Sequence, residues 1–269
     1  MRQRNAFTLI ELLTVISIIV LLMAILLSVV QRVRNQARAV VCQANLKQWG
    51  TILGLYVEEN QGCFPRPLDA TFFLCASLFG ADFGDERAPR LNGNDIKGIL
   101  CCPTAVRPRD ERQRPDDYRV YDYTFRAWER SYKGVSFRGS YGFNKWLLKA
   151  QFDESIPHPW EGIDVFSLRG RASIPTLLDS TEPDYYAFHH AKGPPRRVGI
   201  RSGWGPFCIN RHNGHVNGLF LDWSVRKVGL KELWTLKWHR EFDTAGPWTK
   251  AGGVQPEDWP LWMRNFKDY

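Results

Sequence analysis

Six cysteines are the residues of this chain with the widest choice of chemistry, because thiols can form disulfides or bind a soft metal ion. They are Cys42, Cys63, Cys75, Cys101, Cys102 and Cys208. A zinc site needs clustered ligands, usually with short paired spacings along the chain, and these cysteines do not supply them. We therefore expect disulfides in an oxidising compartment, with some thiols simply buried. The sequence alone leaves the connectivity open.

A second candidate is Glu11, an isolated acid at the start of an apolar run that extends over residues 7–30. The uncharged part, Leu12 to Val30, has nineteen residues. At about 1.5 Å per residue it reaches roughly the 30 Å of a bilayer core. A carboxylate in this position costs about 2.5–3.5 kcal/mol on insertion scales, so we expect it to have a partner of opposite charge. A secretory signal peptide would be shorter and would end in a small-residue cleavage site. We therefore predict a transmembrane helix.

Catalysis is not expected. The sequence contains no nucleophile elbow, phosphate-binding glycine loop or zincin pattern, and four histidines stand in Pro-rich or aromatic contexts without a matching signature. These are His158, His189, His190 and His239. We predict that the chain is not an enzyme and needs no cofactor.

The formal net charge of +8 does not point to nucleic acid. Between residues 85 and 117 arginines alternate with acids, which is typical of a solvated loop surface. Arg32, Arg34 and Arg38 follow the apolar run directly, where basic side chains meet lipid headgroups. We expect a membrane and no nucleic acid as partner.

One helix is predicted from Phe7 to about Val57. Beyond the membrane segment, apolar residues recur at alternating spacings of three and four, so one face should lie on a folded domain. They are Ala39, Cys42, Leu46, Trp49, Leu53 and Tyr56. Gly50 and Gly54 weaken the helix, and Asn60, Gly62 and Pro65 end it.

Short strands are predicted after the helix, at residues 98–102, 139–143 and 174–178, with Pro175 placing the last at an edge or at a strand start. A hairpin is predicted from strands 216–221 and 224–228. Residues 68–79 read as a short helix and 107–117 as a charged loop. The resulting fold class is α+β, a long helix packed on a small antiparallel sheet.

The tail, residues 231–269, is rich in tryptophan: Trp234, Trp238, Trp248, Trp259 and Trp262. One interpretation is an amphipathic helix over about 231–242 that covers the domain, followed by packed coil. The other is a platform that binds a sugar or a protein, because indole faces stack on flat apolar surfaces.

The segment AFTLIEL, residues 6–12, resembles the leader junction of type IV prepilins and type II secretion pseudopilins. The resemblance implies that a prepilin peptidase cuts between Ala6 and Phe7 and methylates the new amino group. Ala6 stands where the family usually has glycine. Glu11 would then be the fifth mature residue, which in this family pairs with the N-terminal amine of a neighbouring subunit.

The stretch RHNGHVNGLFLDWSV is similar to the C-terminal His-x9-Asp-Gly signature of a large group of pilin-like proteins, with nine residues between His212 and Asp222. CQANLKQ, SYGFN and Cys102-Pro103 also match that group's pattern. Trp223 departs from it, since the group usually has glycine there. A two-residue turn of the primed type wants positive φ at this position, so the tryptophan predicts another turn or about 1 kcal/mol of strain.

The resemblance implies a disulfide pairing and a candidate calcium site. The group tends to retain Cys42 and the cysteine before Pro103, which implies a Cys42–Cys102 disulfide and leaves Cys101 for Cys63 or Cys75. Major pseudopilins hold calcium in a C-terminal loop, and the acids that could do so here are Asp179, Glu182 and Asp184.

A metal or ligand site at His212 and Asp222, completed by His215 or by those acids, is one interpretation of the signature. Histidine is a poor calcium ligand, and no segment has the regular oxygen spacing of a calcium loop. We therefore favour a structural role, in which His212 bonds backbone across the hairpin and Asp222 starts the turn through its side chain.

The domain order expected from these features is leader 1–6, transmembrane helix 7–30, amphipathic helix 31–60, extracytoplasmic domain 61–230 and Trp-rich extension 231–269. The resemblance implies a structural subunit of a type II secretion pseudopilus or type IV pilus-like filament, held in the inner membrane with a cytoplasmic N-terminus and a periplasmic body. Its partners would be related subunits, the prepilin peptidase, membrane lipid and, indirectly, an assembly platform and ATPase. The alternative is a membrane-anchored module that captures glycan or protein and never polymerises.

Overall fold

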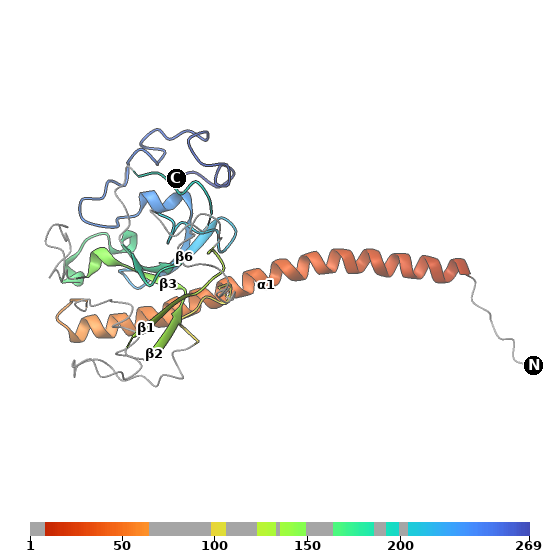
Figure 1. The fold of residues 1–269 in the computed structure, drawn as a ribbon, viewed down its shortest axis with the longest axis horizontal. Helices are drawn as coiled ribbons and strands as arrows, with labels where there is room; N and C mark the ends of the chain where they lie inside the picture. Colours follow the sequence, from red (N-terminus) through yellow and green to blue (C-terminus); the bar gives the residue numbers. More distant parts are fainter. Residues whose placement is uncertain are drawn as a thin grey trace, which may run out of the picture. The chain divides into compact units, whose positions relative to one another are not determined.

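The computed structural model describes residues 9–64, 98–105, 123–132, 135–148, 164–185, 192–198 and 204–269. It confirms the α+β class: one long helix, α1 (Leu9–Glu59), accompanies two β-sheets (Figure 1). The chain divides into two compact units, Met1–Arg38 and Ala39–Tyr269. The boundary falls within α1, so the helix contributes its first part to one unit and its second part to the other.

In the first unit the apolar side chains of α1 are exposed from Leu9 to Val29, with Leu27, for example, 71% exposed. Within the described residues, α1 is the one helix long and apolar enough to cross a membrane. Such a surface is unfavourable in water and favourable in lipid.

In the second unit α1 buries the predicted stripe. All six of its residues, from Ala39 to Tyr56, are at most 7% exposed. The helix ends because the Asn60 side-chain amide donates to the Tyr56 carbonyl at 2.7 Å. Gly62, with φ of +78°, then donates its N–H to the Val57 carbonyl at 2.8 Å. A left-handed glycine after the last turn is a common helix stop.

The main sheet has five strands in the order β5-β3-β4-β6-β7. The strands are β3 (Tyr141–Asn144), β4 (Pro175–Asp179), β5 (Asp184–Tyr185), β6 (His215–Phe220) and β7 (Val225–Gly229). All neighbours are antiparallel except β3 and β5, which are parallel. A separate hairpin is formed by β1 (Trp128–Tyr132) and β2 (Val135–Gly139).

β4 is an interior strand, so the prediction of an edge for residues 174–178 is wrong, and the alternative of a strand start is correct. Pro175 is the first residue of β4, and the pairing with β6 is irregular between Pro175 and Leu177. A proline at that place donates no ladder hydrogen bond, which is why the sheet tolerates it.

Both faces of the main sheet are covered. Leu177 and Leu219 join a core with the stripe of α1, whereas Leu178 and Phe220 join a second core with the C-terminal tail. Sheets buried on both sides carry near-continuous apolar runs, as β4 does.

The tail fills the second core with coil and turns. Its only described helix is the five-residue 3-10 helix η4 (Lys231–Thr235), so the amphipathic helix predicted to continue to residue 242 is wrong. Among the described residues before the tail there are three further 3-10 helices, η1 (Lys145–Leu147), η2 (Val165–Ser167) and η3 (Arg171–Ser173). Residues 98–102, predicted as a strand, contain no strand, and residues 98–100 form a turn. The segments 68–79 and 107–117 lie outside the described residues.

The β6–β7 hairpin closes through a four-residue loop, Leu221 to Ser224, and not through the expected two-residue turn. Asp222 starts it as predicted, since its Oδ1 accepts from the Ser224 N–H at 3.0 Å. Trp223 adopts φ of +64°. Its indole lies over Gly54 of α1, and its carbonyl accepts from Lys47 Nζ at 2.9 Å. Contact with the helix therefore compensates the backbone strain.

Candidate functional site

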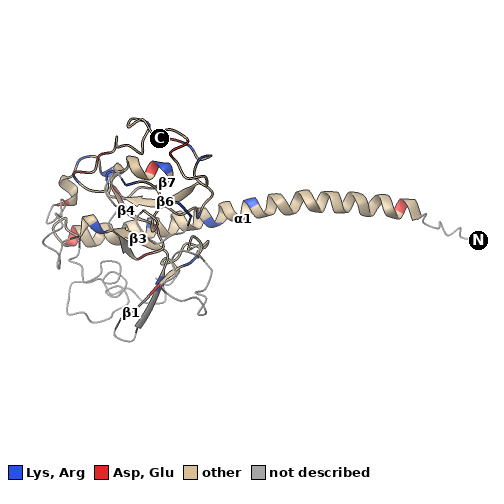
Figure 2. Ribbon diagram, turned by 45° about the horizontal axis from the view of Figure 1, so that its top comes forward, with Lys and Arg blue, Asp and Glu red and all other residues tan. Residues whose placement is uncertain are grey.

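The first candidate site is the start of α1. Ala6 and Phe7 lie outside the described residues, so the cleavage junction stays a prediction. Glu11 is exposed in the first helical turn. Figure 2 shows this acidic position followed by a charge-free stretch of helix, which ends at basic positions further along.

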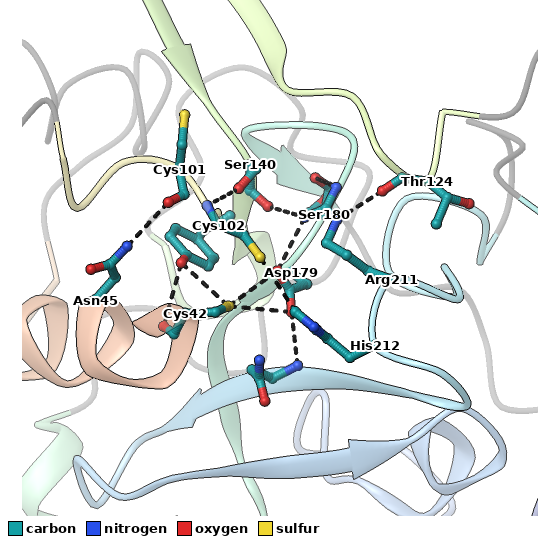
Figure 3. Close-up of polar contacts among 12 residues, drawn as sticks. Cys42, Asn45, Cys101, Cys102, Thr124, Ser140, Asp179, Ser180, Arg211 and His212 are labelled. Atoms are coloured by element: carbon teal, nitrogen blue, oxygen red, sulfur yellow. Dashed lines mark hydrogen bonds and ion pairs between the residues drawn. The ribbon is translucent and has the colours of Figure 1, made fainter. Parts of the chain in front are cut away.

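The second candidate site is a buried polar cluster around Asp179, at the end of β4 (Figure 3). The Asp179 side chain is completely buried. Its Oδ1 accepts from Arg211 Nη1 at 3.1 Å, and its Oδ2 lies 3.0 Å from His212 Nε2. The backbone N–H of Asn217 also donates to Oδ2, at 2.9 Å. The carboxylate is thus held on both oxygens.

Arg211 is equally well satisfied, although its side chain is fully buried. Besides Asp179, its guanidinium donates to four carbonyls, those of Thr124 at 2.8 Å, Ser140 at 2.7 Å, Ser180 at 3.0 Å and Arg126 at 3.3 Å. Arginine suits this role because its rigid fork directs several donors at once. Through these bonds Arg211 links the segment before β1, the start of β3 and the end of β4 to one another.

Two thiols complete the cluster. Cys42 comes from α1, and its Sγ lies 3.5 Å from Asp179 Oδ1 and 3.7 Å from Oδ2. Cys102 comes from the 98–105 segment, and its Sγ lies 3.4 Å from His212 Nε2. Tyr141 Oη donates to Cys42 Sγ at 3.3 Å. One donor atom from each of Cys42, Cys102, Asp179 and His212 lies within 4.8 Å of the other three.

The electrostatics of this cluster follow from burial and charge. Burial alone would raise the pKa of Asp179, but the charge and hydrogen bond of His212, together with Arg211, hold that pKa well below its usual range. Burial would lower the pKa of His212, but Asp179 raises it to about 9. Burial raises the pKa of Cys42. Burial also opposes ionisation of Cys102, yet hydrogen bonds from Cys42 and His212 lower its pKa to about 6. The site favours charged groups that neutralise one another.

Cys42 and Cys102 are brought together, as the resemblance implied, but as free thiols, so the disulfide stays a prediction. Cys63 and Cys101 are also free thiols, and Cys75 lies outside the described residues. The expectation that the cysteines lack clustered partners is wrong for Cys42 and Cys102. Residues that are distant in sequence form a cluster with these two thiols, which the spacing of the cysteines along the chain did not predict.

His212 and Asp222 do not form a joint site. The side chain of His212 points into the buried cluster, and only its backbone N–H bonds the hairpin, to the His215 carbonyl at 3.2 Å. His215 stacks on His212 with ring centroids 5.7 Å apart. Asp222 serves the hairpin loop at the other end of β6.

The calcium interpretation gains no support from Asp179, because cationic and N–H donors and thiols surround it instead of further oxygen ligands. Glu182 is buried nearby in sequence, and for Asp184 the structure describes only the backbone, in β5. Arg211 is the residue that sequence reasoning missed. A signal existed, since an acid ending the apolar run IPTLLD requires a buried cation.

The tryptophans of the tail point mostly inwards. Trp234, Trp238 and Trp259 are at most 2% exposed, and Trp248 and Trp262 are half-buried. Trp234 and Trp238 pack with Trp204 at centroid distances of 4.8 and 5.4 Å. The three buried indoles cannot stack on a glycan, so the binding-platform interpretation loses its main residues.

Comparison with known proteins places the N-terminal segment. Residues 1–27 match the family model of the prokaryotic N-terminal methylation motif. No curated protein and no solved structure matched the chain. The matched segment contains the predicted junction, Glu11 and most of the exposed apolar part of α1. The chain therefore carries the N-terminal methylation motif of type IV pilin-like proteins, and its long helix packed on an antiparallel sheet is consistent with a pilin-like α+β fold.

Proposed function

We propose that this chain is a structural subunit of a type II secretion pseudopilus or a type IV pilus-like filament. The observation that carries the proposal is the methylation motif at residues 1–27, whose described part lies on the portion of α1 where the apolar side chains from Leu9 to Val29 are exposed. A helix of this kind is stable either in lipid or against copies of itself. Assembly exchanges the first environment for the second.

Glu11 supplies the contact that makes the exchange specific. Cleavage between Ala6 and Phe7 leaves a cationic amine on Phe7, four residues before the Glu11 carboxylate, and each charge is costly in hydrocarbon. Opposite charges attract strongly where the dielectric is low, so the amine of an incoming subunit pairs with Glu11 of its neighbour.

The chain resides in the inner membrane, with residues 1–6 in the cytoplasm and the Ala39–Tyr269 unit outside. Its partners are a prepilin peptidase, other pilin-like subunits, inner-membrane lipid and, indirectly, an assembly platform and ATPase. The subunit acts mechanically, as an element of a filament, and requires no cofactor for that role.

Mass spectrometry of the native protein tests the processing step. We expect a mature N-terminus at Phe7, with its amine methylated. A native chain that retains Met1, or that lacks residues 7–30, would contradict the proposal.

Assembly is tested separately with Glu11→Ala. We expect the variant to be cleaved and to stay in the membrane, while its yield in sheared filaments falls to background. Ser17→Ala is the matched control, because Ser17 bonds only its own helix, at the Leu13 carbonyl, and the change removes no charge. Filaments from Glu11→Ala in normal yield would refute the role of the carboxylate.

A further inference from the structure

We propose that the buried cluster at the end of β4 is a structural zinc site, with Cys42, Cys102, Asp179 and His212 as its four ligands. The inference concerns the folded unit and does not depend on whether the chain polymerises. It rests on the ligand types, their mutual distances, the charge of the surroundings and the position of the site in the fold.

The donor set suits zinc. Zinc is bound by cysteine sulfur, histidine nitrogen and carboxylate oxygen, usually with four ligands when the site is structural. Thiolates select against the hard ions calcium and magnesium. All four residues are buried, so the site is closed to further ligands, as structural sites are.

The distances also suit zinc. With bonds of roughly 2.3 Å to sulfur and 2.0–2.2 Å to nitrogen or oxygen, the edges of a zinc tetrahedron measure about 3.3–3.8 Å. The corresponding separations here are 3.0 Å for His212 to Asp179, 3.4 Å for Cys102 to His212, and 3.7 Å for Cys42 to Asp179 Oδ2. Small side-chain shifts therefore suffice to admit the ion.

The surrounding groups already have the arrangement of an outer ligand shell. Arg211 holds Asp179 Oδ1, which leaves Oδ2 as the metal ligand, and the Asn217 N–H fixes that oxygen. Tyr141 donates to the Cys42 sulfur. Such contacts orient the ligands of protein metal sites.

Charge neutrality supports the same assignment. A zinc ion with two thiolates, one carboxylate and a neutral imidazole has a net charge of −1, and the buried guanidinium of Arg211 balances it. Binding displaces the remaining thiol and imidazolium protons of the ligands to solvent. In the metal-bound state the buried guanidinium of Arg211 is therefore the counter-charge of the zinc site.

The ligands come from four separate segments: α1, the 98–105 segment, the end of β4 and the segment that leads into β6. One ion would therefore fasten the helix to the sheet at Cys42, within the first turns of the Ala39–Tyr269 unit. The role is that of a cross-link between helix and sheet.

The test uses the full chain in detergent, purified without a histidine tag or chelator. We expect one zinc ion per chain by elemental analysis, and loss of that zinc in Cys102→Ser and in His212→Ala. Cys101→Ser is the matched control, because the neighbouring thiol is half-buried and interacts with the Arg138 carbonyl at 3.6 Å instead. The control should keep its zinc.

A measurement on the unaltered chain covers the case in which the variants fail to fold. Cobalt(II) exchanged into the site should give an intense thiolate-to-cobalt charge-transfer band, and added zinc should abolish it. Chelation of the zinc should lower the thermal unfolding midpoint of the unaltered chain. The proposal is overturned if the purified chain contains no metal. This holds if the thiols are reduced, and it holds equally if the mass of the chain is lower by two hydrogens, which would show a Cys42–Cys102 disulfide in place of the metal. It is also overturned if cobalt binds without the charge-transfer band.

Discussion

Gly50 and Gly54 lie one helical turn apart on the face of α1 that meets the β6–β7 hairpin, yet alanine should affect them differently. A Cβ at Gly54 would lie 3.4–3.7 Å from atoms of the Trp223 indole, which is ordinary van der Waals contact. A Cβ at Gly50 would lie only 2.9 Å from Leu219 Cδ1. Leu219 is completely buried, so its side chain has little room to move away.

Both substitutions gain helix propensity, about 1 kcal/mol for alanine over glycine. Gly54→Ala should keep this gain and stabilise the protein by up to about 1 kcal/mol. Gly50→Ala pays in addition for overpacking, typically about 1–3 kcal/mol, and should range from neutral to about 2 kcal/mol destabilising. The two variants should therefore differ by about 1–3 kcal/mol in their free energy of unfolding, which a urea titration measures as a shift of its midpoint concentration.

Intrinsic tryptophan fluorescence during urea unfolding of the full chain in detergent measures both changes. Leu219→Ala provides the control, since it removes the clashing methyl group, and in that background Gly50→Ala should become as favourable as Gly54→Ala. Equal stability of the two glycine variants in the unaltered background would refute the close approach of helix and hairpin at Gly50.

Three other substitutions test the cores and the helix end by the same unfolding measurement. Trp238→Ala removes a fully buried indole and should cost about 3–5 kcal/mol, clearly more than Trp262→Ala at a half-buried position; equal costs would contradict the second core. Arg211→Met removes one of the two buried cations that contact Asp179, leaving His212 as the other, and should cost about 3–5 kcal/mol; a neutral result would contradict the Arg211–Asp179 ion pair. Gly62→Ala places a Cβ at φ of +78° against a neighbouring side chain and should cost at least about 1 kcal/mol, and no loss would contradict this helix stop.

The helix and its buried face could be predicted because their signals are local. A charge-free run of membrane length and a repeat of three and four residues depend only on neighbours along the chain. Gly50 and Gly54 seemed to weaken this prediction, but the contact surface explains them, since a larger residue at Gly50 would collide with the hairpin. The reason for glycine at these two positions is a tertiary contact, which cannot be recognised from the local sequence.

The Asp179 cluster could not be predicted in the same way. Its members are separated by up to 170 residues, from Cys42 to His212, and they meet only when α1, β4 and the segment before β6 pack together. Two local signals were available nonetheless. Asp179 ends an apolar strand, and Arg211 precedes a strand that is buried on both faces. A buried acid and a buried base each destabilise the fold when unpaired, so pairing of Asp179 with Arg211 could have been expected.

The nine-residue spacing between His212 and Asp222 suggested one shared site, but it reflects the length of a strand. β6 occupies His215 to Phe220, and six residues at about 3.3 Å each separate its ends by roughly 20 Å. His212 therefore meets Asp179 at one end, while Asp222 starts the loop at the other. A change at Asp222 should disturb the hairpin loop and leave the Asp179 cluster intact, because no described contact joins the two. The signature thus marks two separate structural tasks performed by a single hairpin.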